Sequence, residues 1–268
     1  MTTYQDVLGP AEIYDTRFVP ALFAQWGPIV AAQAGIRAGS SVLDVACGTG
    51  ALTLAAAEVV GPSGSVVGLD ASPDMLAVAR RKPGRIEWRE GRAEALPFLD
   101  ESFDAVASQF GFMFFEDKPR ALAEMLRVLK PDGQLAVAVC DDIARSPGYD
   151  AFARLLDGLF GPPTGDAFRA PFLLGDASVL RELARRAEIV HVEITRHRGW
   201  ARFPSIDALV SAERACAWTL GGMLDDGQFE RLREASHDAL APFVDSDGAV
   251  AFEMPALVLR AGKARLVE

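Results

Sequence analysis

The chain has few cysteines and no long hydrophobic run. Its three cysteines among 268 residues, Cys47, Cys140 and Cys216, match neither a disulfide framework nor a metal-ligand pattern. No apolar run approaches the ~20 residues of a membrane-spanning helix, and the first residues lack the basic start and apolar stretch of a signal peptide. These absences predict reduced thiols, no metal site, no membrane span and a cytoplasmic location.

Positive charge is scarce as well. The 27 Lys and Arg residues are outnumbered by 37 Asp and Glu residues, which gives a net charge of −10. This balance argues against nucleic acid or an anionic membrane surface as a partner. The basic run at residues 80–82 is better explained as the last turn of a helix, where cations complement the helix dipole. A content of 50% hydrophobic and 24% charged residues is ordinary for a globular protein.

The most informative stretch is residues 42–50, Val-Leu-Asp-Val-Ala-Cys-Gly-Thr-Gly. Its apolar start is typical of a buried parallel strand, and apolar residues at helical spacing follow at 52–59. Glycines between a strand and a helix let backbone N–H groups approach a ligand closely. The pair Gly48 and Gly50 alone is equally compatible with a tight turn that binds nothing.

A second strand, at residues 65–70, ends in the carboxylate of Asp70, 20 residues after Gly50. An acidic residue at about this spacing commonly binds the ribose hydroxyls of a nucleotide. Since one helix separates the two strands, their ends should lie side by side. The loop and Asp70 therefore predict a nucleoside-type cofactor site.

Strand and helix patterns alternate along the first half of the chain. Further strands are predicted at 86–90, 103–108, 134–140, 189–195 and 250–260. This order predicts an α/β fold with a doubly wound, Rossmann-like, mostly parallel sheet of seven strands and helical cap insertions. We expect helix caps at Ser72, Asp117, Asp176 and Ser205.

The remaining segments predict a lid and a cap. Residues 1–35 should form a helical lid, with Phe18, Leu22, Trp26 and Val30 on one face and Pro20 in the first turn. Residues 36–268 should form the main domain. Insertions at about 144–175, with one short helix near 152–160, and 199–247 should form a cap that selects the substrate.

Four blocks of sequence, in order, resemble class I S-adenosylmethionine-dependent methyltransferases. The blocks lie at residues 43–50, 69–76, 93–104 and 127–133. The similarity is greatest to the small-molecule methyltransferases of the ubiquinone and menaquinone biosynthesis group, and it is dense over residues 42–140. It implies methyl transfer from S-adenosylmethionine to a small-molecule acceptor by in-line displacement, with release of S-adenosylhomocysteine.

The resemblance also assigns cofactor contacts. They are Asp44, Ala46, Gly48, Thr49 and Gly50 for the methionine part, Asp70 for the ribose, Ala71, Met75, Ala93 and Glu94 for the adenine, Ser108 and Gln109 beside the sulfonium, and Tyr14 as a cover. One position departs from the family, because Arg92 stands where an aspartate usually accepts a hydrogen bond from adenine. An arginine cannot accept it, so a backbone carbonyl or Glu94 must do so, or adenine is held less tightly.

Residues for the methyl acceptor are less well indicated. Phe110, Phe112 and Met113 follow the fourth strand and are predicted to form an apolar wall, although each is also compatible with the core. Asp141 and Asp142 follow the fifth strand and are candidates for accepting a proton or orienting the acceptor, or are simply a helix cap.

Two other functions stay open on the sequence alone. A protein of this fold could bind the cofactor without catalysis. An NAD(P)-dependent oxidoreductase also uses a glycine loop and a ribose carboxylate, but its third glycine is replaced here by Thr53, and no Tyr-x-x-x-Lys pair occurs.

Overall fold

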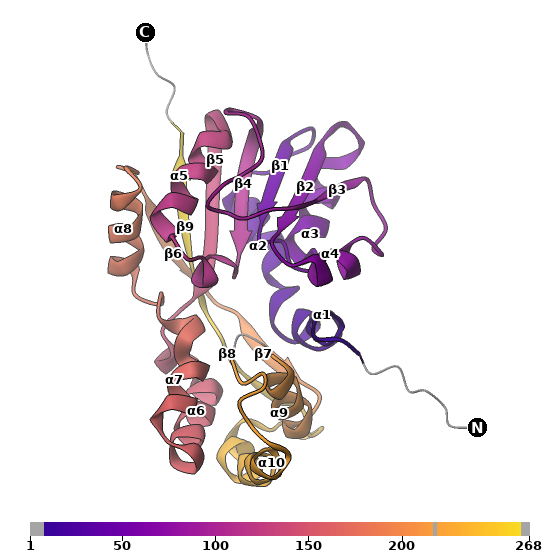
Figure 1. Cartoon of the computed structure of the whole chain (residues 1–268), viewed down its shortest axis with the longest axis vertical. Coiled ribbons are helices and arrows are strands. Elements are labelled where there is room, and N and C mark those ends of the chain that lie inside the picture. Colours follow the sequence, from indigo (N-terminus) through magenta and orange to yellow (C-terminus); the bar gives the residue numbers. More distant parts are fainter. Residues whose placement is uncertain (1–7, 217–218, 264–268) are drawn as a thin grey trace, which may run out of the picture.

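The computed structural model describes residues 8–216 and 219–263. A seven-stranded sheet flanked by helices forms one half of the molecule, and a group of helices with a two-stranded sheet lies beyond one end of it (Figure 1). The strand order of the large sheet is β3-β2-β1-β4-β5-β9-β6. Its strands are β1 (Ser41–Val45), β2 (Ser65–Asp70), β3 (Ile86–Glu90), β4 (Phe103–Gln109), β5 (Leu129–Cys140), β6 (Glu193–His197) and β9 (Ala256–Gly262).

All neighbouring strands from β3 to β5 are parallel, and β9 runs antiparallel to both β5 and β6. Successive residues of β1 alternate between two hydrophobic clusters: Val42 belongs to one, and Leu43 and Val45 to the other. The sheet is therefore buried on both faces, as its apolar strands require. The predicted fold class, with its seven mostly parallel strands, is confirmed.

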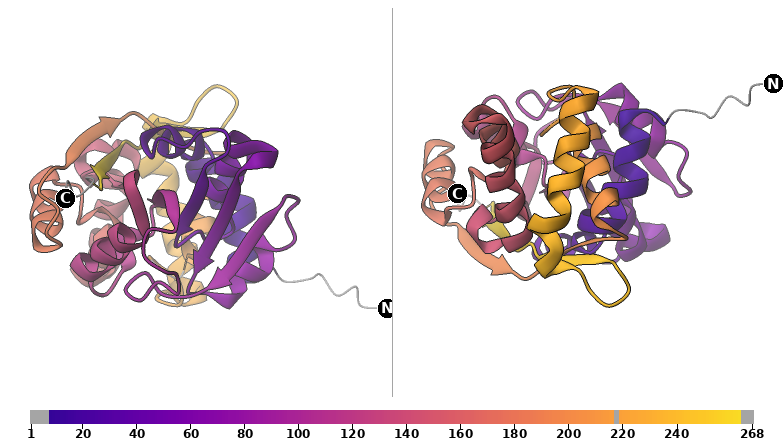
Figure 2. Two further views of the ribbon diagram at one scale, coloured as in Figure 1. Left: turned by 90° about the horizontal axis from the view of Figure 1, so that it is seen from above. Right: turned by 90° about the horizontal axis from the view of Figure 1, so that it is seen from below.

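Helices cover the two faces separately (Figures 1 and 2). On one face α2 (Trp26–Gln33) and α3 (Ala51–Val60) pack on the sheet, and on the other face lie α5 (Lys118–Val128) and α8 (Ala177–Arg186). The helix α4 (Pro73–Ala79) packs beside β2 and β3. All four predicted caps are confirmed, because the side chains of Ser72, Asp117, Asp176 and Ser205 each accept a hydrogen bond from a backbone N–H of the following helix.

The N-terminal segment differs from its prediction. A short helix α1 (Pro10–Ile13) continues directly into a π-type helix η1 (Tyr14–Phe23), and α2 follows. Pro20 thus lies inside a helix and not in a first turn. Proline has no backbone N–H to donate, and wider π-type bonding occurs in the turns around it, as in the bond from Ala24 N to Val19 O.

The basic run has a different role from the one predicted. Helix α4 ends at Ala79, so the run lies beyond it. Arg81 pairs with Glu12 at 2.7 Å, and Lys82 pairs with Asp15 at 2.5 Å. These cations therefore attach the N-terminal segment to the main domain.

Three predictions for the second half were wrong in detail. Two helices, α6 (Pro147–Phe160) and α7 (Pro162–Arg169), occupy the first insertion in place of one, because Gly161 (φ 87°) interrupts the helix and a proline pair restarts it. The strand predicted at 189–195 is β6, which starts at Glu193, and Val190 is 84% exposed. The last strand is divided into β8 (Val250–Glu253) and β9, since Pro255 interrupts the pairing.

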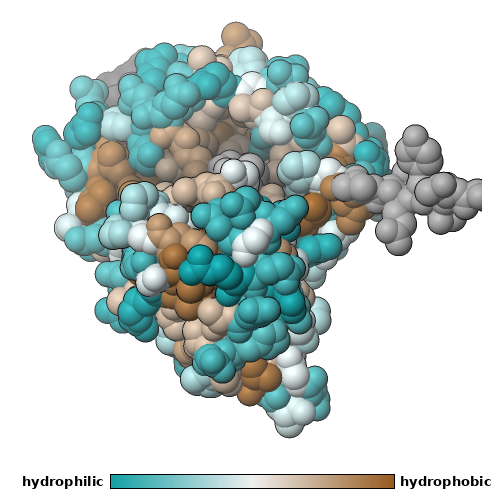
Figure 3. All heavy atoms as spheres, turned by 60° about the horizontal axis from the view of Figure 1, so that its bottom comes forward, coloured by the Kyte–Doolittle hydropathy of each residue, from teal (hydrophilic) through white to brown (hydrophobic). Residues whose placement is uncertain are grey.

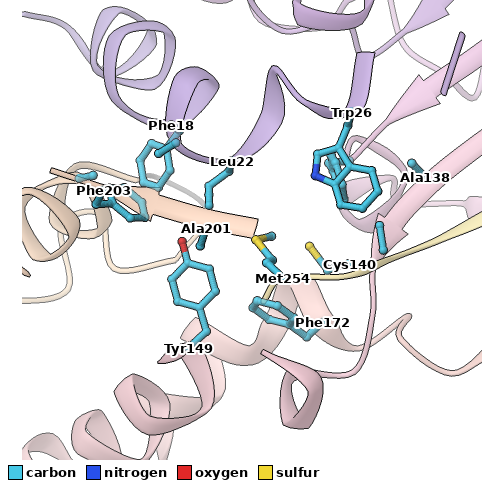
Figure 4. Close-up of a cluster of buried hydrophobic side chains, with 14 of the residues drawn as sticks. Phe18, Leu22, Trp26, Ala138, Cys140, Tyr149, Phe172, Ala201, Phe203 and Met254 are labelled. Carbon is cyan, nitrogen blue, oxygen red and sulfur yellow. The ribbon is translucent and has the colours of Figure 1, made fainter. Parts of the chain in front are cut away.

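The cap consists of α6, α7, α9 (Ile206–Ala215), α10 (Asp226–Leu240) and a small sheet of β8 with β7 (Trp200–Phe203), which the sequence did not predict. Short 3₁₀ turns complete the chain: η2 (Gly61–Ser63), η3 (Phe112–Phe114), η4 (Ile143–Arg145), η5 (Ala170–Phe172) and η6 (Ala241–Phe243). Side chains of the cap and of η1, such as Phe18 and Phe203, meet in one core (Figure 4).

Candidate functional site

The glycine loop lies at the carboxyl end of β1. Ala46, Gly48 and Gly50 all have positive φ angles (59°, 55° and 95°), and α3 begins directly after Gly50. The space above Gly50 is filled by the Trp88 ring, whose nearest atom would be 2.6 Å from a Cβ. Ala46 and Gly48, in contrast, line a cavity. The loop thus presents its first half to a ligand and packs its second half against β3.

Asp70 lies beside this loop, as predicted from the spacing. Its Oδ2 accepts a hydrogen bond from the Gly48 backbone N–H at 2.7 Å, and its Oδ1 accepts one from Ser72 N–H at 2.8 Å. Burial raises the pKa of this carboxyl, and the two backbone donors oppose the shift. The carboxylate fixes the loop and faces the same cavity.

Asp44 is buried behind the loop and is 1% exposed. Its Oδ2 accepts from the Thr53 hydroxyl at 2.6 Å, while its Oδ1 has no hydrogen-bond partner among the described residues. Burial raises the pKa of Asp44 to about 7. Thr49 is also fully buried, and its hydroxyl oxygen has no partner within the described part of the chain.

Ser108 and Gln109 end β4 next to the loop. The Ser108 hydroxyl and the Gln109 Oε1 are buried without a hydrogen-bond partner in the described residues, and Gln109 Nε2 donates to Phe23 O at 3.1 Å. Unpaired buried polar atoms are unfavourable in a closed core but useful where a polar ligand binds. Gln109 lines the cavity, and Asp44 and Ser108 do not.

Tyr14 covers the loop from the N-terminal segment. Its ring lies 3.6–4.0 Å from the position that a Cβ on Gly48 would take, and it stacks on Phe23 with ring centroids 5.4 Å apart. Burial, and next the negative charge of Asp70, raises the pKa of Tyr14, so its hydroxyl is neutral at ordinary pH. The Tyr14 side chain therefore lies over the first half of the loop.

The block around Arg92 does not reach the cavity in the same way. Ala93 is buried in the core, and Glu94 accepts a hydrogen bond from Glu116 N–H at 2.9 Å. Arg92 pairs with Glu116 at 2.9 Å and with Glu94 at 3.5 Å. Neither Ala93 nor Glu94 is among the cavity-lining residues, whereas the predicted Ala71 and Met75 are.

One cavity of about 400 Å³ joins Ala46, Gly48, Asp70 and Gln109 to the cap, whereas the predicted cofactor residues Asp44, Thr49, Gly50 and Ser108 are not among its lining residues. With the cap end of the molecule turned forward, Figure 3 shows a hollow in which apolar side chains gather. The N-terminal segment contributes Tyr14, Phe18, Leu22 and Phe23; the sheet side contributes Ala46, Gly48, Asp70, Ala71, Ser72, Met75, Gln109, Phe110, Gly111, Met113, Phe114, Phe115 and Cys140; and the cap side contributes Tyr149, Phe168, Pro171, Phe172, Glu213, Cys216, Thr219 and Met254.

The predicted acceptor residues divide into two groups. Phe110 and Met113 line the cavity. Phe112 is fully buried in the core on the other face of the sheet, because the 3₁₀ turn η3 directs successive side chains to different sides. The prediction for Phe112 therefore needs correction.

Asp141 and Asp142 also lie outside the cavity lining. Asp141 is 1% exposed and pairs with Arg196 of β6, and more distantly with Arg145 at 3.9 Å. Asp142 accepts a hydrogen bond from Ala144 N–H at 2.9 Å and so caps η4. Their roles in this structure are an ion pair and a cap, so we assign neither of them to catalysis.

Glu213 is the carboxyl group of the cavity that the sequence analysis missed, together with the other cap residues of the lining, such as Tyr149. It lies on α9 in the buried stripe formed by Ile206, Leu209 and Val210, at the i+7 position, where an apolar residue is expected. A carboxylate in an apolar stripe was the signal that could have identified it. Among the described residues, no Lys, Arg or His lines this cavity, and no group of three potential metal ligands occurs.

Comparisons with known proteins match the chain to methyltransferases. A family model described as a methyltransferase domain matches residues 42–133. A ubiquinone/menaquinone biosynthesis C-methyltransferase of Hahella chejuensis is 47% identical over 118 residues, which cover 42% of this chain and 47% of that protein. A demethylmenaquinone methyltransferase of Lactococcus lactis is 36% identical over 194 residues, covering 66% of this chain and 76% of that protein.

A solved structure from Anabaena variabilis, described as a methyltransferase of an antibiotic biosynthesis pathway, superposes with a TM-score of 0.63 at 17% identity. The match covers 87% of this chain and 96% of that one, and at this identity it shows the fold alone. The chain spans about half the length of several of the curated relatives that it matches.

Proposed function

The chain belongs to the S-adenosylmethionine-dependent methyltransferase family that includes the ubiquinone/menaquinone and demethylmenaquinone enzymes, and from this membership we propose that it methylates a small-molecule acceptor. The observation that carries the proposal is the single cavity that joins the glycine loop and Asp70 to an apolar chamber under the cap. A donor and an acceptor can meet in such a cavity, shielded from water.

The residues present fit the cofactor. Gly48 lines the cavity without a side chain, beneath the Tyr14 ring, and Asp70 keeps acceptor capacity beyond its two backbone bonds. Gln109, which lines the cavity, adds an unpaired Oε1, whereas the unpaired oxygens of Asp44 and Ser108 belong to residues outside the cavity lining. In our proposal Asp44, Ala46 and Gly48 hold the methionine part, Asp70 the ribose, and Ala71 and Met75 the adenine.

The bound cofactor supplies the methyl group and its sulfur leaving group. The task of this chain is to hold the acceptor in line with the methyl group and to exclude water. The apolar side chains of Phe110 and Met113 support the first role from the sheet side. Tyr14 and Phe18 support the second from the N-terminal segment, which we propose is a lid over the cofactor.

If the N-terminal segment is a lid, weakening its attachment should accelerate cofactor release. The half-buried pair Lys82–Asp15 and the exposed pair Arg81–Glu12 hold it to the end of α4. Pairs of this kind contribute about 0.2–1 kcal/mol each. Replacing Lys82 with Met and Arg81 with Ala together should therefore raise the dissociation rate of S-adenosylhomocysteine about 2- to 30-fold, measured by stopped-flow fluorescence.

A matched control is Arg185→Ala, which breaks an exposed pair with Glu182 on the distant helix α8. This variant should release the ligand at the wild-type rate. Exchanging the partners, with Lys82→Asp and Asp15→Lys in one chain, should restore slow release. An unchanged rate in the Lys82/Arg81 double variant would remove the lid from the proposal.

Two alternatives are separated by one set of measurements. Calorimetry with S-adenosylhomocysteine and with NAD distinguishes a methyltransferase from an oxidoreductase, and tight binding of NAD alone would contradict our proposal. Release of S-adenosylhomocysteine in the presence of quinols, phenols and amines distinguishes an enzyme from a protein that only binds the cofactor.

No helix within the described ranges is long and apolar enough to cross a membrane. We infer reduced thiols and a cytoplasmic site of action from the cysteine pattern.

A further inference from the structure

A carboxyl group is buried at the cap end of the cavity. Glu213 is 3% exposed, yet the Arg nearest to it in sequence, Arg214, pairs with Asp226 and stacks on Phe229. Burying a carboxylate without a cation is strongly unfavourable. Burial accordingly raises the pKa of Glu213 to about 7. A residue held at this cost is a candidate for function, because the core gains nothing from it.

The groups that face Glu213 are hydroxyls and thiols. The Thr219 hydroxyl donates to Glu213 at 3.1 Å, and the hydroxyls of Tyr149 and Thr219 both lower its pKa against the effect of burial. Tyr149 is 2% exposed, comes from α6, and its hydroxyl has no hydrogen bond of normal geometry to the described residues. Cys140, at the end of β5, is close enough for Glu213 to raise its pKa. The titratable neighbours of Glu213 are therefore Tyr149, Cys140 and, nearby on its own segment, Cys216.

The cavity lining selects against negative charge. Its described residues include the carboxyls of Asp70 and Glu213 and no cationic side chain. An acceptor with a carboxylate or phosphate would be repelled and would find no partner. Aromatic rings such as Phe168 and Phe172 surround Tyr149, with centroids 5.4 and 5.9 Å from its ring. The chamber therefore suits an uncharged, largely apolar molecule that carries a polar group for Glu213 and Tyr149.

We propose that Glu213 binds a hydroxyl of an uncharged acceptor and takes its proton, and that the methyl group is transferred to the oxygen of that hydroxyl. This inference rests on the methyltransferase function proposed above. The new bond forms between the acceptor oxygen and the methyl carbon while the methyl C–S bond breaks and its electron pair passes to sulfur. The hydroxyl proton moves to the Glu213 carboxylate and later to solvent. Tyr149 donates to the same oxygen and orients it.

The pKa of Glu213 limits which acceptor hydroxyls it can deprotonate. A phenol has a pKa of about 10, within a few units of Glu213, whereas an aliphatic alcohol is far less acidic. Proton transfer to a carboxyl group is efficient only when the two pKa values are close. The acceptor hydroxyl should therefore be a phenol or an enol.

The test uses the full chain with S-adenosylmethionine, or with S-adenosylhomocysteine for binding. The probes are 2-naphthol, hydroquinone and methyl 4-hydroxybenzoate, with the anion 4-hydroxybenzoate as a charged match to the ester. We expect the wild type to bind and methylate at least one uncharged phenol at oxygen, and to reject the anion. In Glu213→Gln, kcat for that phenol should fall about 100-fold or more. The rise of kcat/KM with pH near 7 should disappear in that variant.

Binding of S-adenosylhomocysteine by Glu213→Gln should match the wild type, which shows that the variant is folded. Glu234→Gln, on the exposed side of α10, is the matched control and should change neither turnover nor the pH profile. Tyr149→Phe should lower kcat about 10-fold and keep the pH profile.

Any one of four other outcomes would contradict the proposed role of Glu213 in O-methylation. These outcomes are wild-type turnover and an unchanged pH profile in Glu213→Gln, a methyl group found on carbon or nitrogen, a preference for the anion, or no binding of any of the uncharged phenols by the S-adenosylhomocysteine complex. In all of them, cofactor binding by the wild type leaves the methyltransferase proposal standing. Failure to bind S-adenosylhomocysteine at all would instead contradict that broader proposal.

Discussion

Replacing Asp70 with Asn should lower the affinity for S-adenosylhomocysteine about 100-fold. The Asp70 carboxylate accepts from Gly48 N–H and from Ser72 N–H, and in our proposal it also accepts from the ribose. An amide has only one accepting oxygen, so one of its NH₂ donors must face a backbone donor or a ribose hydroxyl. Hydrogen bonds to a charged group contribute about 1.5–3 kcal/mol, so losing one or two gives roughly this factor. Isothermal titration calorimetry measures it directly.

A neighbouring residue provides the control for this variant. Asp74 lies exposed in the first turn of α4, four positions after Asp70, and Asp74→Asn changes the net charge by the same amount. It should bind S-adenosylhomocysteine as the wild type does. Wild-type affinity in Asp70→Asn would show that the carboxylate only fixes the loop and would remove it from the cofactor site.

The stability of the ligand-free protein should fall as pH rises from about 5 to about 7. Burial raises the pKa of Glu213 from an ordinary value of 4.5 to about 7, and that of Asp44 from 3.8 to about 7. In this interval the unfolded chain has released protons that the folded protein still holds, so raising the pH favours unfolding. Each pKa unit corresponds to about 1.4 kcal/mol, so Glu213 alone lowers the free energy of unfolding by about 3 kcal/mol.

Urea titrations across this pH range test the sign and the assignment. In Glu213→Gln, the slope of the free energy of unfolding against pH should decrease by the equivalent of about one proton, and in Asp44→Asn it should decrease by a similar amount. Below the unfolded pKa values both states are protonated, and above about pH 7 both are ionised, so the curve should level off at each end. Stability that stays constant or increases between about pH 5 and pH 7 would show that these carboxyls are ionised in the folded protein.

The first half of the fold could be predicted because its information is local. The loop at residues 42–50, the spacing to Asp70 and the cap residues each depend on a few neighbouring positions. The residues that we propose to bind the cofactor can therefore be recognised from short sequence patterns, without the tertiary structure.

The acceptor half could not be predicted because its information is long-range. Asp141 was interpreted as a candidate base, but its partner Arg196 lies 55 positions away in sequence. Phe110, which follows β4 with a positive φ of 55°, lines the cavity, whereas Phe112, at the start of η3, lies in the core on the other face of the sheet. Glu213 enters the cavity because α9 packs against α10, β7 and η1, a placement that no pattern in residues 204–241 specifies.

The division of the last strand at Pro255 has a consequence for how the cavity opens. The chain passes between sheet and cap four times, after β5, before α8, between β6 and β7, and between β8 and β9. At the last of these crossings, Met254 N–H donates to Gly199 O and Asp141 N–H donates to Pro255 O. Four connections, three of which are joined by these backbone bonds, restrict rotation of the cap on the sheet more than a single connection would. Molecules should therefore enter and leave by displacement of residues 10–23, which two ion pairs hold to α4, while the cap stays a fixed wall.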